Sequence, residues 1–458
     1  MYAFARHMTK RMKAVAAAGA VAAFWLAVWA FAAALVAQPL ILPGPGAVMV
    51  ALLRLVCDAN TWAILAGSGL RILGGLALAT VCGGVLAGVS VRSRTFARLV
   101  APALSFVKAT PVACVVVLLL IWLGSARVSI AAVFLMALPG VYFSLVEGLA
   151  QADKPLEQMF RLHGVRGWRL FCAHTWREVL PFVLSCARAV IGMSWKAGVA
   201  AELIGMATGT VGERIYQAKL LIETADLLAW TVLVVAASWA CERVLVWLLR
   251  ASGSVAWRVA VRTHGHGLRG RAGAASDGAS AELALAVGDR APWAPALGGL
   301  VLRVPTGGRT CVMGASGVGK STLLALAAGE CAPCSMVFQD VRLVEDASAL
   351  DNVLVCADAR VDASSAAALL RLLVPGVDVH ARVAELSGGQ RRRVEIARAL
   401  LCPGDAVILD EPFTGLDTAA RDACAEVLLD LLDGRMLLLA THDAVDAQAL
   451  NISDIITL

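Results

Sequence analysis

Charged residues are scarce in this sequence. They make up 16% of the 458 residues, whereas soluble domains carry about 25%. Hydrophobic residues account for 59%, and the mean hydropathy is +0.76. This composition excludes a disordered chain, a coiled coil and an ordinary cytosolic enzyme, and it indicates an integral membrane protein.

The sequence also lacks the cysteine spacing of a disulfide framework. The 12 cysteines are scattered through a long chain, whereas a disulfide framework belongs to short, secreted, cysteine-dense sequences. One CxxC, Cys331 to Cys334, has no second pair and no histidine nearby. The pattern favours ordinary packing there, with zinc or redox chemistry as the alternative.

Acidic residues are rare in the first half. Residues 1–250 hold 22 Lys and Arg against 10 Asp and Glu, and residues 251–458 hold 18 against 24. A basic apolar half and an acidic polar half suggest two domains in different solvents. We expect a membrane domain at 1–250, a flexible Gly- and Ser-rich linker at 251–280, in which His264 and His266 are solvated, and a second domain at 281–458.

The first half contains six apolar runs of a length that can span a bilayer as a helix. Lys and Arg cluster before the first run and after the second, fourth and sixth, which places both ends of the domain on the cytoplasmic side. The predicted runs are 14–37, 64–91, 107–123, 129–149, 180–201 and 227–249.

Two polar features of this half admit two interpretations each. The loop from Gln151 to Arg177 is either an amphipathic segment anchored at the interface by Trp168 and Trp176, or a short helix that docks on another domain. Lys196 and Glu202 either lie at a helix end or form a pair or a translocation path, because charges inside a membrane are costly and usually functional.

The second half contains a phosphate-binding loop. An apolar strand ending at Met313 is followed by G-x-x-x-x-G-K-S and then by a helical run, which is the context that supports this motif. Backbone N–H groups and the helix N-terminus favour phosphate oxygens. Lys320 would reach the β- and γ-phosphates and Ser321 would hold Mg²⁺. The residues predicted to bind nucleotide here are Gly314, Ser316, Gly317, Gly319, Lys320, Ser321 and Thr322.

A second strand, 406–409, ends in two carboxylates. Asp410 is placed to bind Mg²⁺ and Glu411 to polarise the attacking water, because phosphoryl transfer needs mainly positioning and charge neutralisation. Between the two strands, Leu386 to Gln390 reads Leu-Ser-Gly-Gly-Gln and precedes a basic run. Taken alone, that segment could be a loop followed by a solvated helix face.

In this order the motifs resemble the ATP-binding-cassette family over nearly all of residues 281–458. The fold implied is a membrane all-α domain of about six transmembrane helices followed by an α/β P-loop NTPase domain. The resemblance implies ATP and Mg²⁺ as cofactors. It assigns Glu411, His442 and Gln339 to catalysis, Ser321, Asp410 and Gln339 to the metal, and Ser387, Gly388, Gly389 and Gln390 to nucleotide contacts in a head-to-tail dimer. Trp293 is either the aromatic that stacks on adenine or a packing residue.

The membrane half resembles the permeases of binding-protein-dependent importers. Two of its motifs, Leu42-Pro43-Gly44-Pro45 and Ala200-Ala201-Glu202-Leu203-Ile204-Gly205, are similar to the nitrate, taurine and sulfonate group of these permeases. Glu157, Gly164 and Leu180-Pro181 lie where those permeases have their coupling loop, which favours docking for the Gln151–Arg177 segment. Three features depart from the family. The two domains are fused, Lys320 and Gln339 are 19 positions apart, about half the family's spacing, and the chain stops shortly after His442.

Together these features predict an ATP-driven importer subunit of a bacterial inner membrane, with a cytoplasmic ATPase domain, that takes up a small polar solute. The partners expected are a second copy of the chain, an extracytoplasmic substrate-binding protein and the lipid bilayer, with a second ATPase chain as the alternative to the second copy and with no nucleic acid. An exporter half-transporter and a membrane protein with a degenerate regulatory cassette are the alternatives. Short loops argue against the first, and intact Lys320, Asp410, Glu411 and His442 argue against the second.

Overall fold

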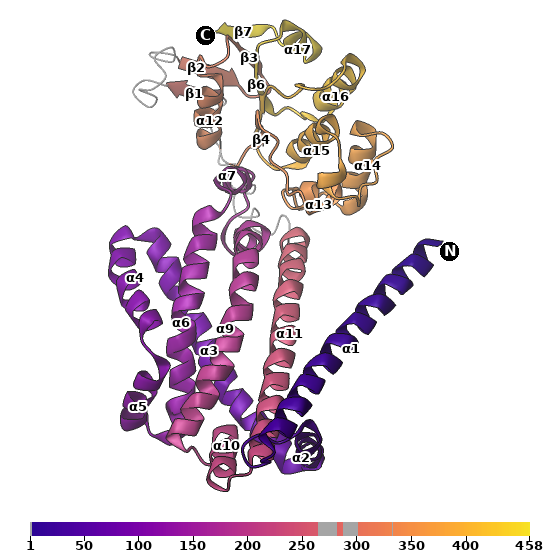
Figure 1. Cartoon of the computed structure of the whole chain (residues 1–458). Helices are drawn as coiled ribbons and strands as arrows, with labels where there is room; N and C mark the ends of the chain where they lie inside the picture. Colours follow the sequence, from indigo (N-terminus) through magenta and orange to yellow (C-terminus); the bar gives the residue numbers. More distant parts are fainter. Residues whose placement is uncertain (1, 264–281, 287–300, 332) are drawn as a thin grey trace. The chain divides into compact units, whose positions relative to one another are not determined.

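The computed structural model describes residues 2–263, 282–286, 301–331 and 333–458, which divide into two compact units (Figure 1). The membrane unit comprises residues up to 151 together with 179–250, and the sheet unit comprises 152–178 and 251–458. Trp293 and linker positions 264–280 lie outside the described residues. The long loop predicted between the fourth and fifth spans therefore belongs to the sheet unit.

The regular secondary structure of the membrane unit is all helical in its described residues. Five helices are long and apolar enough to cross a membrane, and a sixth span is formed if the bent pair α4–α5 counts as one. The predicted count of about six is confirmed. The helices are α1 (Tyr2–Val36), α2 (Pro45–Cys57), α3 (Ala59–Arg92), α4 (Arg94–Ala109), α5 (Val112–Leu123), α6 (Ser125–Gln151), α9 (Trp176–Gly205), α10 (Val211–Leu220) and α11 (Thr224–Arg262).

The third predicted span, 107–123, is the part that the structure changes most. The chain bends by 103° between α4 and α5. Pro111 caps α5, and the residue before a proline is disfavoured in helical conformation, so Thr110 takes an extended backbone and ends α4. The span is a broken pair of helices and not one continuous helix.

Small residues bring α3 into close contact with α6 and α9. A Cβ added at Gly75 would lie 2.5 Å from the carbonyl oxygen of Ile130, and one at Gly198 would lie 2.5 Å from Ile72. In a bilayer, helix association depends on such close backbone approach, because lipid tails are as apolar as leucine. These glycines therefore set the spacing of the central helices.

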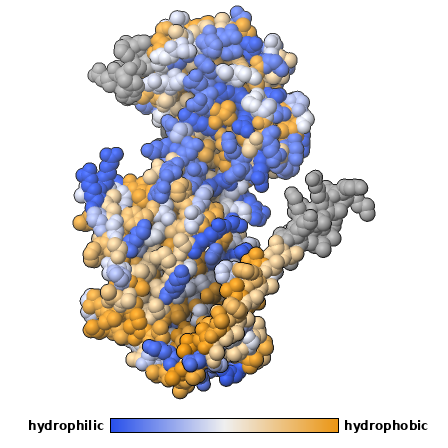
Figure 2. Space-filling view, viewed as in Figure 1, coloured by the Kyte–Doolittle hydropathy of each residue, from blue (hydrophilic) through white to orange (hydrophobic). Residues whose placement is uncertain are grey.

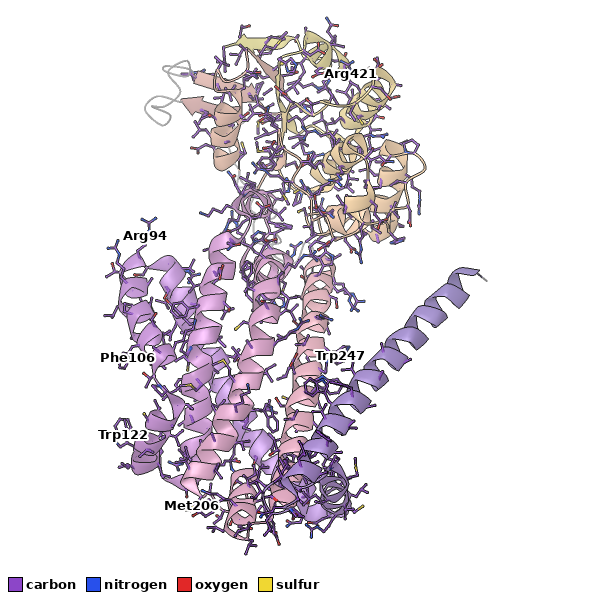
Figure 3. All side chains as sticks on the ribbon, viewed as in Figure 1. Arg94, Phe106, Trp122, Met206, Trp247 and Arg421 are labelled. Atoms are coloured by element: carbon purple, nitrogen blue, oxygen red, sulfur yellow. The ribbon has the colours of Figure 1, made fainter. Side chains whose placement is uncertain are left out.

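The face of the membrane unit that Figure 2 shows is largely apolar, with scattered hydrophilic patches. Phe106 and Trp122 project from α4 and α5, and Trp247 projects from α11 (Figure 3), each more than half exposed. Large exposed apolar faces on helices of this length fit a lipid solvent. The chain is a multi-pass membrane protein.

Glu202 forms an ion pair with Arg71. Its side chain is fully buried, and Oε1 lies 3.8 Å from Arg71 Nη1. Oε2 accepts hydrogen bonds from Ser68 Oγ at 2.9 Å and from the Gly212 amide at 3.4 Å. Lys196 is exposed, so of the interpretations left open for these two residues the structure does not support a Lys196–Glu202 pair. Burial makes pairing necessary, and the partner comes from α3.

The sheet unit is built on a five-stranded parallel sheet of order β4-β5-β6-β3-β7, beside a two-stranded antiparallel sheet of β1 and β2. Strands β3, β4, β5 and β6 run in the same direction, so their carboxyl ends meet at one edge. The strands are β1 (Glu282–Ala286), β2 (Val301–Pro305), β3 (Arg309–Met313), β4 (Ser335–Val337), β5 (Ala406–Asp410), β6 (Met436–Thr441) and β7 (Asp454–Thr457).

Helices surround this sheet, and α13, α14 and α15 form a group of their own (Figure 1). The helical elements of the unit are α7 (Lys154–Leu162), α8 (Gly167–Leu170), the π-helical turn Phe171–Thr175, α12 (Lys320–Glu330), α13 (Ala349–Leu354), α14 (Ala363–Leu373), the 3-10 turn Val383–Glu385, α15 (Gly388–Leu401), α16 (Thr418–Leu431) and α17 (Ala444–Ala449).

The predicted linker starts too early. Helix α11 continues to Arg262, so residues 251–262 are helical and not a flexible tether. Trp257 and Ala260 pack into the same hydrophobic core as the strands, and the Trp257 indole donates a hydrogen bond to Asp351 Oδ2 at 3.1 Å. Burial of these side chains outweighs the helix-breaking tendency of Ser252-Gly253-Ser254.

Candidate functional site

The loop between β3 and α12 has the conformation of a phosphate cradle. Gly317 and Gly319 have φ values of 85° and 113°, a region that glycine occupies without steric cost. Lys320 begins α12 and is buried, and its Nζ donates to the carbonyls of Gly314 at 2.7 Å and Ala315 at 3.1 Å. Ser316 and Gly317 are exposed at the tip. The predicted strand–loop–helix context is confirmed.

The two carboxylates follow β5 at the edge of the sheet. Asp410 is buried at the end of the strand, and the Ser321 hydroxyl donates a hydrogen bond to it. Glu411 has φ 46°, an uncommon conformation outside glycine, and its amide donates to the Ala440 carbonyl at 2.9 Å on β6. The left-handed backbone turns the chain away from the strand at the catalytic candidate.

His442 lies beside Glu411. Its Nδ1 is 3.2 Å from Glu411 Oε1, the carboxylate is mostly buried and the imidazole is mostly exposed. Burial raises the pKa of Asp410, and the neighbouring Glu411 charge adds to this, while the Ser321 hydrogen bond, Lys320 and Arg392 oppose it. The site therefore gathers two carboxylates, one lysine and one imidazole at the ends of β3, β5 and β6.

Residues 387–390 form the N-terminus of α15. Ser387 Oγ accepts from the Gln390 amide at 3.3 Å, and Gln390 Oε1 accepts from the Ser387 amide at 2.9 Å, a reciprocal capping box. Gly388 and Gly389 supply the first turn. A Cβ at Gly389 would lie 3.3 Å from the Gly415 carbonyl, so this turn also packs against the segment after β5.

Arg392 is a functional candidate that the sequence reasoning missed. Its side chain is buried, and its guanidinium donates to the carbonyls of Phe338, Gln339 (2.7 Å) and Glu411 (3.2 Å). It therefore holds together the backbone at Gln339, whose residue is exposed, and at Glu411. The signal was present, because the basic run after Gln390 continues into an apolar helix that cannot leave all its charges in solvent.

The segment 152–178, here called the docking segment, packs against the rest of the sheet unit at several points. Leu156, Met159 and Phe160 join its hydrophobic core. The Cys334 amide donates to the Leu162 carbonyl at 3.1 Å, and Arg169 Nη2 donates to the Val355 carbonyl at 2.6 Å. Of the two interpretations of this loop, the structure favours docking, although Trp168 is exposed.

His163 is the most deeply buried titratable group of the docking segment. Its Nε2 lies 3.1 Å from the Met336 nitrogen and 3.2 Å from the Met336 oxygen on β4. Burial, followed by the positive charge of Arg398, lowers the pKa of His163 to about 3. The ring is therefore neutral at physiological pH. Cys334, of the CxxC, is also buried, which raises its pKa to about 12 and keeps it a thiol.

The two halves of the chain match two different known families. The family of the binding-protein-dependent transport system inner membrane component matches residues 79–253, and the ABC transporter family matches residues 332–414. An aliphatic sulfonates import ATP-binding protein of Paracoccus denitrificans is 34% identical over 179 residues, which are 36% of this chain and 72% of that relative. The chain belongs to the ATP-binding-cassette transporter family.

Two further relatives match the cassette. A taurine import ATP-binding protein of Pseudomonas aeruginosa is 38% identical over 173 residues, covering 32% of this chain and 66% of the relative. A thiamine import ATP-binding protein of Jannaschia sp. is 34% identical over 178 residues, covering 32% of this chain and 77% of the relative. The chain thus fuses a permease domain to the ATPase domain of an importer, and the ATPase domain binds ATP.

Proposed function

We propose that this chain is an importer subunit of a bacterial inner membrane that uses ATP hydrolysis to take up a small polar solute delivered by a separate extracytoplasmic binding protein. The observation that carries the proposal is the docking segment. It lies between two membrane helices in sequence, yet its side chains complete the core of the ATPase domain. Nucleotide-driven movement of the cassette, on the cytoplasmic side, can thus act on the permease directly.

The geometry of the ATP site supports the following roles for the residues predicted from sequence. Backbone amides of 314–319 and Lys320 bind the phosphates. Ser321 and Asp410 are joined by a hydrogen bond and offer the oxygen ligands that Mg²⁺ prefers, with Gln339 as a further ligand. The ion, when bound, neutralises phosphate charge. Glu411 accepts a proton from the attacking water, and His442, which holds Glu411, contacts the γ-phosphate.

Two copies of the chain complete the site in this proposal. The capping box leaves Ser387 and the glycines of α15 at an exposed helix N-terminus, where amide groups and the helix dipole favour an anion. They would contact the γ-phosphate held by Lys320 of a second copy. A second, separate ATPase chain in place of the second copy is the alternative arrangement.

The solute class follows from relatives and remains part of the proposal. The matched relatives are named for import of aliphatic sulfonates, taurine and thiamine, which are all small and polar or charged. The test is Mg²⁺-dependent ATP hydrolysis by the purified chain in lipid, with and without ligand-loaded binding proteins. Stimulation by one loaded binding protein supports the proposal and identifies the solute class. Hydrolysis that no binding protein alters contradicts import.

A further inference from the structure

Helix α15 carries three charged side chains into the core of the sheet unit. The side chains of Glu395 and Arg398 are fully buried, and that of Arg392 is 4% exposed. Glu395 Oε2 lies 2.9 Å from Arg392 Nη1, and Oε1 lies 3.2 Å from Arg398 Nη2. Burying a charge is unfavourable unless the charge is paired and hydrogen-bonded, so the Glu395 carboxylate stabilises the two buried guanidinium groups.

One end of this cluster reaches the ATP site. Arg392 donates to the carbonyls of Gln339 and Glu411, 2.7 Å and 3.2 Å away, and to the Phe338 carbonyl. Arg392 contacts the main-chain carbonyls of Gln339 and Glu411, so its hydrogen bonds depend on the backbone positions of these residues and not on the conformations of their side chains. A shift of either segment must move Arg392 or break its hydrogen bonds.

The other end reaches helix α7 of the docking segment through Arg342. The Arg342 amide donates to Glu395 Oε1 at 2.8 Å, and its carbonyl accepts from Arg398 Nη1 at 2.5 Å. Its guanidinium lies 3.7 Å from the Phe338 ring centroid and donates to the Pro155 carbonyl at 3.2 Å and to Gln158 Oε1 at 3.4 Å. The backbone of Arg342 faces Glu395 and its side chain faces α7.

We propose that Glu395 is a positioning residue that passes the state of the ATP site to helix α7. The Glu395 carboxylate pairs with Arg392, which is hydrogen-bonded to the backbone at Gln339 and Glu411. The same carboxylate accepts a hydrogen bond from the backbone of Arg342, whose side chain contacts α7. We call this chain of contacts, Arg392–Glu395–Arg342, the bridge. Charge-assisted hydrogen bonds in a low-dielectric interior are strong and strongly directional, so a shift of Arg392 is transmitted through Glu395 to Arg342. The inference rests on the proposed function, in which α7 responds to nucleotide.

The test is hydrogen–deuterium exchange of the full chain in lipid, with and without Mg²⁺ and a non-hydrolysable ATP analogue. Two peptides decide it: 314–321, which contains the phosphate loop, and 154–162, which is α7. We expect the analogue to slow exchange in both peptides of the parent chain. Exchange reports local opening and needs neither the solute nor a binding protein.

Two variants remove different contacts of the bridge. Glu395→Gln keeps the size of the side chain and removes the charge that pairs with Arg392 and Arg398. Arg342→Ala removes the side-chain contacts with α7 and with the Phe338 ring. It keeps the bonds of residue 342 to Glu395 and Arg398, because those use its backbone. Glu345→Gln is the matched control, since Glu345 is exposed on the same segment and pairs only at 3.5 Å with Arg391.

We expect the phosphate-loop peptide to keep its nucleotide response in Arg342→Ala and Glu345→Gln, and the α7 response to be lost in Arg342→Ala and kept in Glu345→Gln. Glu395→Gln should also lose the α7 response; if it unfolds the cassette, the phosphate-loop response disappears too and Arg342→Ala decides. An unchanged α7 response in Arg342→Ala overturns the inference, as does an α7 peptide that never responds in the parent. A parent whose phosphate loop does not respond contradicts ATP binding itself, and with it the proposed function.

Discussion

Acid should weaken the docking segment through His163. The ring is 1% exposed and lies against the backbone of Met336, and its pKa is lowered to about 3 from 6.5, chiefly by burial. An unfolded chain binds a proton at this residue below its ordinary pKa, whereas the folded chain keeps the ring neutral until about pH 3. The stability that the neutral ring contributes is therefore complete above pH 6.5 and is lost as the pH falls toward 3.

The size of the effect follows from the shift. When the pH falls from 7 to 5, the His163 ring of the unfolded chain takes up a proton, because pH 5 is about 1.5 units below its ordinary pKa of 6.5. The ring of the folded chain stays neutral over this range, because its pKa is about 3. At 1.36 kcal/mol per unit, the loss is about 2 kcal/mol. His163→Gln removes the titration and leaves an amide oxygen that can accept from the Met336 amide.

The assay is urea unfolding of the full chain in detergent micelles, followed by tryptophan fluorescence at pH 7 and pH 5. Other acid-sensitive groups are common to both chains, so the difference between chains isolates residue 163. We expect His163→Gln to be the less stable chain at pH 7 and to recover about 2 kcal/mol relative to the parent at pH 5. Parallel pH profiles for the two chains would refute the buried, neutral ring.

Three further predictions concern catalysis and packing. Glu411→Gln should trap ATP and abolish turnover, as measured by nucleotide retention and phosphate release; normal hydrolysis would sink its role. Lys320→Ala should weaken ATP binding about 10-fold to 100-fold, since the charged hydrogen bonds of its ammonium group are lost; calorimetric titration with a non-hydrolysable analogue checks this, and unchanged affinity contradicts it. Gly75→Ala should destabilise the membrane unit by about 1–3 kcal/mol, because its Cβ would meet Ile130 at 2.5 Å, whereas Gly74→Ala, with nothing within 4 Å, should not; equal thermal midpoints for these two variants would argue against close α3–α6 contact.

The local structure of the candidate ATP site could be predicted from sequence because short patterns determine it. The phosphate loop needs two glycines with positive φ and a lysine at the start of a helix, and these residues are adjacent in the chain. Asp410 and Glu411 end an apolar strand, so their place at the sheet edge follows from the strand itself. Six apolar runs gave the membrane helices for the same reason.

Contacts between distant segments could not be predicted in this way. Glu202 pairs with Arg71, 131 positions earlier, and nothing in the spacing of either residue selects the other. Arg392 and Glu395 look like one face of a basic helix, and only the fold shows them in the core. The end of α11 resembles a tether in sequence because of Ser252-Gly253-Ser254, whereas the side chains that keep it helical pack against strands that lie elsewhere in the chain.

The fused docking segment and the shortened cassette belong to one structural solution. Only four residues separate α12 from β4, where the family normally has more chain, and β4 is the end strand of its sheet. An end strand presents backbone groups that need partners. Here the Cys334 amide bonds the Leu162 carbonyl, and the Met336 backbone bonds the ring of His163. The docking segment thus covers an edge of the ATPase sheet and fills part of its core. A cassette made as a separate chain would have to bind this segment in an intermolecular encounter. Fusion keeps them at high effective concentration, which gives a physical reason for the two domains to share one chain.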